Sequence, residues 1–525
     1  MPRIALLTAA LTLSIAAPLA AQDVRLPDMG SSAGTLISDS QQAEYGQMLL
    51  SQLRHHGYIL DDPQLDAWLR DVGIGLAANS DRPRQSFTFF WMRDRQINAF
   101  ATLGGYIGLN AGLVLAAESE GQMASVLAHE IAHVTQDHVL RSVERAQRDS
   151  IPILLAMLGA IAIAQSSSSG GSSDNASMAA LAIGQGLMAQ RQINYTRSNE
   201  SEADRIGMQA LARSGYDPND AAAMFQRMQS AFRANRGGER ERLPDYLQTH
   251  PVTTARVAEA KQNAERLAAR GSGFGGSLAG DNPLLPGSLR IATTAAGGDT
   301  GQYGWARERL RVLSANTPAE AVREYRQLSS RASLDDAQRY GLGLARLLAG
   351  EGGAAMAELG QLLDRHPGNL WLELAMGEAE ARAGRHAAAS ARFDRLVERM
   401  PRNKAVALTY VGVLNERATA DAGRRAQAIL RPLLAESGSD PVFQARFARA
   451  SEIAGDPVRA GEAWAEAAFL NGRPEQALLQ LNTLKQRDDL DYYARARIDA
   501  RIASITPTVL ELRRQGVRDE VLRGG

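Results

Sequence analysis

The chain has 525 residues, which is more than one hydrophobic core accommodates, so two or three domains are expected. Its 58 Lys and Arg residues balance 58 Asp and Glu residues, which argues against a nucleic-acid partner held by non-specific charge. The sequence contains no cysteine, which excludes a disulfide framework and a lipid-modified cysteine. Low aromatic content and abundant alanine favour a mainly α-helical protein.

Residues 1–21 have the pattern of an export signal peptide. Arg3 supplies a positive charge, an apolar stretch runs from Ile4 to Ala17, and small residues precede an expected cleavage site after Ala21. A transmembrane anchor is the alternative, but this apolar stretch is too short to span a bilayer comfortably. An exported protein without disulfides fits the bacterial periplasm, where we expect this one to reside.

The first half of the chain alternates helical and strand patterns. Apolar residues recur at helical spacing from Ala43 to Ala78, whereas Phe87–Met92 and Tyr106–Asn110 are typical of short strands. A long helix is expected from about Glu120 to Gln147.

Two apolar helices follow, separated by a Ser/Gly-rich stretch at Gln165–Asn175. They cover about Ile151–Ala164 and Met178–Met188, and fourteen apolar residues cannot cross a bilayer. This pair could be buried core, a mobile cover over a site, or a contact with the membrane surface. Further helices are expected at about Ser198–Ser214 and from Pro251 to Ala269.

Beyond a Gly-, Ser- and Pro-rich linker at residues 271–301 the chain repeats itself. A small residue followed four positions later by a large apolar one recurs at intervals of 34, 34, 37 and 34 residues. The small residues are Ala321, Ala355, Ala389, Ala426 and Ala460. This pattern resembles the tetratricopeptide repeat, a helix–turn–helix unit that stacks into a solenoid with a concave binding surface. An irregular helical bundle is the alternative.

The strongest chemical signal is His129-Glu130-Ile131-Ala132-His133. Two histidines four apart lie on one face of a helix, so both can bind the same metal ion. Glu130 can then reach a water on that metal without being a ligand, which is the arrangement for zinc-dependent peptide hydrolysis. The alternative is that both are ordinary core or surface histidines of a helix and bind no metal. His138 is expected to point elsewhere and to be structural.

A catalytic zinc needs a third protein ligand, and the acidic stretch from Asn199 to Arg205 supplies candidates. Glu200 and Asp204 share a helix face, so one can bind the metal while the other orients a histidine. Spacing alone does not distinguish Glu200 from Glu202 as the ligand.

Four sequence blocks together resemble one zinc peptidase family, that of the HtpX and CAAX prenyl proteases, and within it the periplasmic BepA-type proteins. The blocks are Asn98-Ala99-Phe100-Ala101 with Gly104-Gly105-Tyr106-Ile107, the His129–His133 motif, Glu200-Ser201-Glu202-Ala203-Asp204-Arg205, and Thr249-His250-Pro251. The resemblance implies that His129, His133 and Glu200 bind one zinc ion, that Glu130 is the general base and that Asp204 supports a ligand.

The resemblance also implies roles for two further regions. His250 would lie on a loop that places its imidazole on the open position of the zinc and keeps the enzyme latent. The strand that carries Gly105, Tyr106, Ile107 and Gly108 would border the cleft, and as an edge strand it could bind an extended substrate through main-chain hydrogen bonds. An ordinary structural strand is the alternative.

We therefore expect a mainly α-helical chain with an α+β protease domain, a small β-sheet and an α-solenoid. The expected divisions are a signal peptide at 1–21, a zinc metalloprotease domain at 22–270, a linker at 271–301, tetratricopeptide-like repeats at 302–505 and a tail at 506–525. The expected function is degradation of stalled outer-membrane β-barrel precursors, with the repeats contacting clients or the outer-membrane assembly machinery. A mainly non-enzymatic assembly chaperone with a latent zinc site is the alternative.

Overall fold

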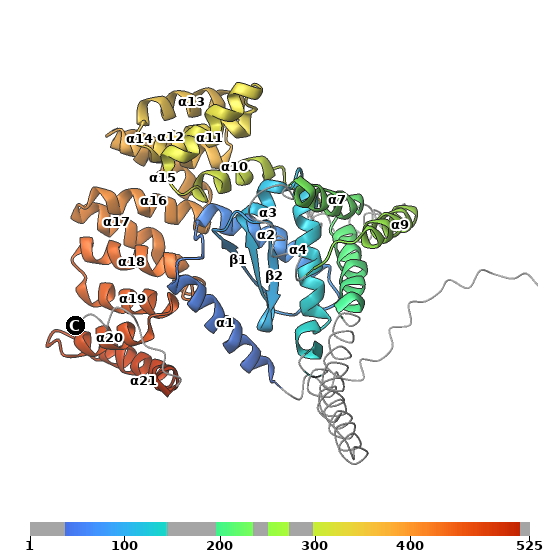
Figure 1. The fold of residues 1–525 in the computed structure, drawn as a ribbon. Coiled ribbons are helices and arrows are strands. Elements are labelled where there is room, and N and C mark those ends of the chain that lie inside the picture. Colours follow the sequence, from blue (N-terminus) through green and yellow to red (C-terminus); the bar gives the residue numbers. More distant parts are fainter. Residues whose placement is uncertain (1–36, 143, 145–195, 235–249, 272–297, 515–525) are drawn as a thin grey trace, which may run out of the picture.

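The computed structural model describes residues 37–142, 144, 196–234, 250–271 and 298–514 (Figure 1). The predicted signal peptide, the paired apolar helices between residues 151 and 188, most of the linker and the end of the tail lie outside these described residues. Within them, no helix is both long and apolar enough to cross a membrane.

The first domain is built around a three-stranded sheet. Helices α1 (Asp39–His55) and α2 (Pro63–Ala78) precede strands β1 (Thr88–Met92), β2 (Ala99–Thr102) and β3 (Tyr106–Asn110). The sequence predicted β1 and β3 nearly to the residue. It missed β2, because four residues are too few to show the alternation by which a strand is recognised.

β3 is the central strand of this sheet, in the order β1-β3-β2, parallel to β1 and antiparallel to β2. The prediction of an edge strand at Gly105-Tyr106-Ile107-Gly108 is therefore wrong, since β3 is paired on both sides. The cause lies in the tight turn before it, where Gly104 and Gly105 have φ of 74° and 79°. That turn folds β3 back against β2, so that β1 and β2 form the edges.

Further helices surround this sheet in the part of the first domain that the structure describes. They are α3 (Ala111–Ala116), α4 (Glu120–Thr135), a helix at 196–213, α7 (Asn219–Ala234) and α9 (Thr254–Gly271). α4 packs against α2, β2 and α7, and α7 packs against α9. α4 therefore lies at the centre of the domain (Figure 1).

α4 ends well before the predicted limit at Gln147. The chain turns at Gln136 and Asp137, where Asp137 has φ of 53°, and a new helical segment begins at residue 138. Arg82 donates to a carboxylate oxygen of Asp137 at 2.7 Å and so ties this turn to the connection between α2 and β1.

The second half of the chain is a solenoid of paired helices, as the repeat pattern predicted. Its helices are α10 (Tyr303–Leu313), α11 (Pro318–Arg331), α12 (Asp336–Leu348), α13 (Gly352–Arg365), α14 (Leu370–Arg382), α15 (His386–Arg399), α16 (Lys404–Arg417), α17 (Ala420–Leu430) with a short 3₁₀ turn at Arg431–Leu433, α18 (Pro441–Ala454), α19 (Pro457–Leu470), α20 (Pro474–Lys485) and α21 (Tyr492–Arg514). The five repeat alanines are buried on α11, α13, α15, α17 and α19. α21 continues past residue 505, the predicted end of the repeats.

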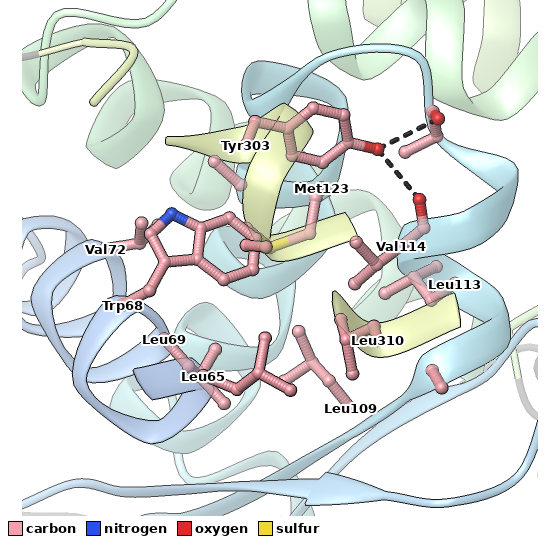
Figure 2. Packing of buried hydrophobic residues seen from close by; sticks show 14 of the residues in the cluster. Leu65, Trp68, Leu69, Val72, Leu109, Leu113, Val114, Met123, Tyr303 and Leu310 are labelled. Carbon is pink, nitrogen blue, oxygen red and sulfur yellow. Dashed lines mark hydrogen bonds between the residues drawn. The ribbon is translucent and has the colours of Figure 1, made fainter. Parts of the chain in front are cut away.

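The two halves share one hydrophobic core. Trp68 of α2 and Trp91 of β1 stack with ring centroids 5.9 Å apart, and Tyr303 of α10 packs beside Trp68. The Tyr303 hydroxyl donates to the carbonyl oxygens of Val114 and Ala117, at 2.8 and 2.9 Å (Figure 2). The solenoid therefore begins inside the core of the first domain.

Glu120, the first residue of α4, ties this helix to the segment that enters the solenoid. Its buried carboxylate accepts hydrogen bonds from Trp68 Nε1 at 3.0 Å, from the Tyr216 hydroxyl at 2.8 Å and from the Thr300 backbone N–H at 2.8 Å. A buried carboxylate is tolerated when it is fully hydrogen-bonded, and here it lies at the positive end of the helix dipole.

A buried ion pair adds a second connection. Arg309 of α10 donates to both oxygens of Asp62, at 2.8 and 2.6 Å, while Asp62 also caps α2 by accepting from the Leu65 N–H at 3.0 Å. Burial raises the pKa of Asp62, but the charge and hydrogen bonds of Arg309 outweigh burial and hold that pKa below its ordinary value.

Replacing Arg309 by methionine leaves the Asp62 carboxylate buried without its partner. We expect the free energy of unfolding at pH 7 to fall by about 3–5 kcal/mol, measured by urea denaturation followed by circular dichroism. Because the folded pKa of Asp62 is depressed, the stabilisation is present above about pH 4 and is lost as the pH falls further, so the two proteins should converge in acid.

The control adds Asp62→Asn, which keeps the helix cap and removes the unpaired charge. This double variant should recover part of the lost stability. A double variant as unstable as Arg309→Met would show that the unpaired Asp62 charge is not the cause of the lost stability.

Candidate metal centre

The two motif histidines lie in the second half of α4. Ser119 caps this helix by accepting a hydrogen bond from the Gln122 backbone N–H at 3.1 Å, and the helix runs unbroken through the motif. His129 and His133 lie on one face with their Nε2 atoms 3.0 Å apart. Both side chains are buried, and so is Glu130 between them.

Glu200, on the helix at 196–213, brings a carboxylate to the same point. Its oxygens lie 3.4 Å from His129 Nε2 and 3.3 Å from His133 Nε2. Two ligands of a tetrahedral zinc ion, each bound at about 2.0–2.1 Å, are separated by about 3.3 Å. The nitrogen and oxygen donors present here are therefore of the types and at the spacing that a zinc ion accepts.

Small residues allow the two helices to approach this closely. Ala132 and Ala203 are buried together between them. Gly207 lies against α4 so tightly that a Cβ there would be 3.0 Å from backbone atoms of Ala128 and His129. A larger side chain would push the helix that carries Glu200 away from the histidines.

His250, just before α9, supplies a fourth donor. Its Nδ1 is 2.8 Å from a Glu200 oxygen and 3.5 Å from His129 Nε2. The donor atoms of His129, His133, Glu200 and His250 all lie within 4.8 Å of one another. His250 is thus a candidate fourth donor to the same metal ion.

The carboxylates of Glu200 and Asp204 place negative charge beside the two histidines. Burial lowers the pKa of His129, but hydrogen bonds to Asp204 and Glu200 and their charges outweigh it and raise that pKa to about 10. Burial, together with the neighbouring charge of His129, lowers the pKa of His133 to about 3. Burial raises the pKa of Glu200, yet hydrogen bonds from three imidazoles hold it well below its ordinary value. The same negative field would stabilise a bound divalent cation.

Glu130 faces this donor set without joining it. Its Oε1 is buried, lies 3.8 Å from His250 Nε2, and has no hydrogen-bond partner within the part of the chain that the structure describes. A buried carboxylate oxygen without a partner is costly, and it is suited to accept a proton from a water beside the donors.

Sequence comparison places the chain among known peptidases. Residues 63–264 match peptidase family M48, and residues 346–409 match the tetratricopeptide repeat. The chain is 33% identical to the beta-barrel assembly-enhancing protease of Escherichia coli (strain K12) over 375 residues, which are 71% of this chain and 70% of the relative. The chain belongs to peptidase family M48.

Other relatives of this M48 chain match shorter regions. It is 39% identical to a putative beta-barrel assembly-enhancing protease of Vibrio cholerae over 262 residues, 49% of this chain and 52% of the relative, so the match spans about half of that relative. It is 26% identical to the mitochondrial metalloendopeptidase OMA1 of Schizosaccharomyces pombe over 171 residues, 33% of this chain and 44% of the relative. The predicted resemblance is confirmed, and residues 63–264 form a metallopeptidase domain.

In this M48 domain Asp204 binds the far side of His129. An Asp204 oxygen lies 2.9 Å from His129 Nδ1, which leaves Nε2 directed at the donor set. Arg256 of α9 donates to both Asp204 oxygens at 2.8 Å, to the Pro251 carbonyl oxygen at 3.0 Å, and lies 2.8 Å from a Glu200 oxygen. One buried guanidinium therefore holds two carboxylates and the chain segment beside His250.

The sequence patterns did not identify Arg256 as a residue of the site. It lies on the amphipathic helix α9, where an arginine ordinarily faces solvent, and its spacing from His250 carries no recognisable metal-binding pattern. Only the folded arrangement shows that it is buried against Asp204.

Glu202 and His138 form a separate group beside the site. Glu202, the alternative third ligand, accepts from His138 Nε2 at 3.2 Å and from Arg141 at 3.0 Å. His138 Nδ1 is 2.8 Å from His133 Nδ1, so the expectation that His138 points away from the motif was wrong. It failed because the helix breaks at residues 136 and 137, which turns His138 back toward His133.

Replacing Arg256 by glutamine should weaken zinc binding about 10–100-fold, because Asp204 and Glu200 lose the group that orients them. Competition with a chromogenic chelator measures this affinity directly. Arg266→Gln, an exposed position on the same helix, is the matched control and should bind zinc normally. Equal zinc affinity in the two variants would mean that Arg256 does not organise the centre.

Proposed function

We propose that the protein is a zinc-dependent endopeptidase of the bacterial periplasm that degrades misfolded or stalled precursors of outer-membrane β-barrel proteins. The observation that carries this proposal is the convergence of His129, His133 and Glu200 beside the buried carboxylate of Glu130. Membership of peptidase family M48 supports the reaction class, and the similarity to beta-barrel assembly-enhancing proteases supports a link to β-barrel assembly.

His129, His133 and Glu200 would hold one zinc ion per chain through two imidazole nitrogens and a carboxylate. Zinc, when bound, acts as a Lewis acid that polarises a peptide carbonyl and activates a water. Glu130 takes the proton of the attacking water and passes it to the departing amine, which is general base and general acid catalysis by one carboxylate. Asp204 and Arg256 keep His129 in the orientation that this geometry needs.

His250 would keep this site latent. Its Nε2 lies 3.8 Å from Glu130, so that the imidazole would compete with a substrate carbonyl and water for the space beside the general base. Its side chain is 13% exposed, the most exposed of the four candidate ligands. Displacement of His250 would expose the fourth position and switch the enzyme on.

The solenoid would bind clients or the outer-membrane assembly machinery. Tetratricopeptide-type solenoids hold partner segments on their inner surface, which is formed by the first helix of each pair. Three such helices, α14, α16 and α18, line a cavity of about 300 Å³ whose charged residues include Glu378, Arg382 and Arg446. Such a cavity suits polar groups of a protein partner.

Export to the periplasm rests on the signal-like pattern of residues 1–21 and on the absence of cysteine. No described helix is long and apolar enough to anchor the chain in a membrane. The proposal includes a peripheral contact with the membrane and no membrane span, because the apolar stretches after residue 21 are too short to cross a bilayer.

A non-enzymatic assembly chaperone is the second candidate function. The observation that favours it is the same position of His250, since a permanently occupied fourth site would leave only the solenoid active. In that case zinc would be a structural element that holds α4, the helix at 196–213 and the His250 segment together.

Cleavage of an unfolded β-barrel protein by the zinc-loaded protein separates these functions. Glu130→Gln should reduce kcat/KM about 10²–10⁴-fold, since glutamine cannot accept the proton. His250→Ala should raise the rate above that of the natural sequence, and adding Glu130→Gln to it should abolish the gain. Product formation is measured by gel densitometry and mass spectrometry.

The chaperone function would be favoured if the protein binds one zinc ion per chain but shows no Glu130-dependent cleavage. This result would have to hold both in the natural sequence and in the His250→Ala variant. A His250→Ala variant that cleaves more slowly than the natural sequence would contradict the proposal that His250 keeps the site latent. It would instead make His250 a contributor to catalysis.

A further inference from the structure

His138 is buried against the far side of His133, away from the donor set. It begins the helical segment after the turn at Gln136 and Asp137 and is 3% exposed. Its Nδ1 lies 2.8 Å from His133 Nδ1, a hydrogen-bond distance between two imidazoles. A hydrogen bond at this distance requires one ring to donate and the other to accept.

The donor and acceptor can be assigned from the chemistry of His133. A histidine that binds a metal through Nε2 carries its proton on Nδ1, so His133 must donate and His138 must accept. His138 then carries its own proton on Nε2, which faces the Glu202 carboxylate at 3.2 Å. In this assignment Nδ1 of His133 donates to Nδ1 of His138, and Nε2 of His138 donates to Glu202. Both hydrogen bonds can therefore form with neutral imidazoles.

Glu202 is itself held in place. Arg141 donates to the same Glu202 oxygen at 3.0 Å and also donates to the Gln136 carbonyl oxygen at 3.0 Å. Arg141 thus connects Glu202 to the turn that directs His138 toward the site. The Arg82–Asp137 ion pair anchors that turn from the other side.

We infer that His138, oriented by Glu202, is a positioning residue that fixes the tautomer and the ring direction of the candidate ligand His133. This inference rests on the proposed function only in taking His133 as a zinc ligand. Each motif histidine then has its own support: Asp204 and Arg256 for His129, and His138, Glu202 and Arg141 for His133.

The two supports differ in charge. Asp204 places a carboxylate directly on His129, whereas a neutral imidazole separates Glu202 from His133. The second arrangement orients the ligand without adding a full negative charge next to it, which leaves a bound metal a stronger Lewis acid.

The test compares two substitutions of His138 in the full chain. His138→Leu removes the acceptor, and zinc affinity should fall about 10–100-fold in competition with a chromogenic chelator. His138→Asn places its Oδ1 near the former Nδ1 and should restore affinity to within a few-fold of the natural sequence. His386→Leu, an exposed histidine of the solenoid, is the control and should have no effect.

A second pair of variants guards against loss of folding at the buried position. Glu202→Gln keeps an oxygen that accepts from His138, whereas Glu202→Leu does not, and the Glu202 side chain is 29% exposed. Circular dichroism of each metal-free variant establishes that it is folded. Zinc affinity should be nearly normal for the glutamine variant and clearly reduced for the leucine variant.

Zinc affinity is measured without substrate, so absence of peptidase activity would count against the proposed function and not against this inference. Natural zinc affinity in folded His138→Leu and Glu202→Leu variants would overturn it. Equal losses in the asparagine and leucine variants of His138 would also overturn it, because a purely structural role does not depend on an acceptor atom.

Discussion

The metal centre depends on the close approach of α4 and the helix at 196–213. A zinc ion requires its donors within about 3.3 Å of one another, whereas packed helix axes are usually about 8–10 Å apart. Ala132, Ala203 and Gly207 keep side-chain bulk out of the interface, so that the short side chain of Glu200 reaches both histidines. The remaining groups of the site are arranged around this contact.

The centre combines a rigid part with a more exposed one. Asp204, held by Arg256, contacts the Nδ1 side of His129, and His138, held by Glu202, contacts the Nδ1 side of His133. The helix α4 that carries both histidines is held at its first residue by the hydrogen bonds of Glu120. His250 comes from a separate segment and is the most exposed of the four donors. In the proposed function it is this separate segment that would move to open the site.

The first domain and the solenoid are joined by contacts of three kinds. Tyr303 lies in the core of the first domain, Glu120 binds the chain at Thr300, and Arg309 pairs with Asp62 at the start of α2. Figure 1 shows α1 and α2 beside the later solenoid helices, and Gly472 lies against the backbone of Ser51 in α1. The two halves therefore form one unit, and their relative position is set by polar as well as apolar packing.

Local patterns in the sequence predicted much of this protein. Helical periodicity predicted the solenoid, since each repeat alanine must be small where two helices cross, and the four-residue spacing of His129 and His133 follows from the helix itself. The choice between Glu200 and Glu202 needed the family resemblance, because both lie on the same helix within one turn. Membership of peptidase family M48 was likewise recognisable from short blocks.

Other features depend on contacts between segments far apart in the chain. The central position of β3 follows from a glycine turn that folds it against β2, and the role of His138 follows from a break in α4 held by Arg82. Arg256 resembles a surface arginine until α9 packs beside Asp204. The sequence by itself determined which helices form and which donors they carry, because those properties are local. Apart from Asp204, which the resemblance already implied, only the tertiary structure decided which side chains support the donors, because that depends on where each helix ends and what packs against it.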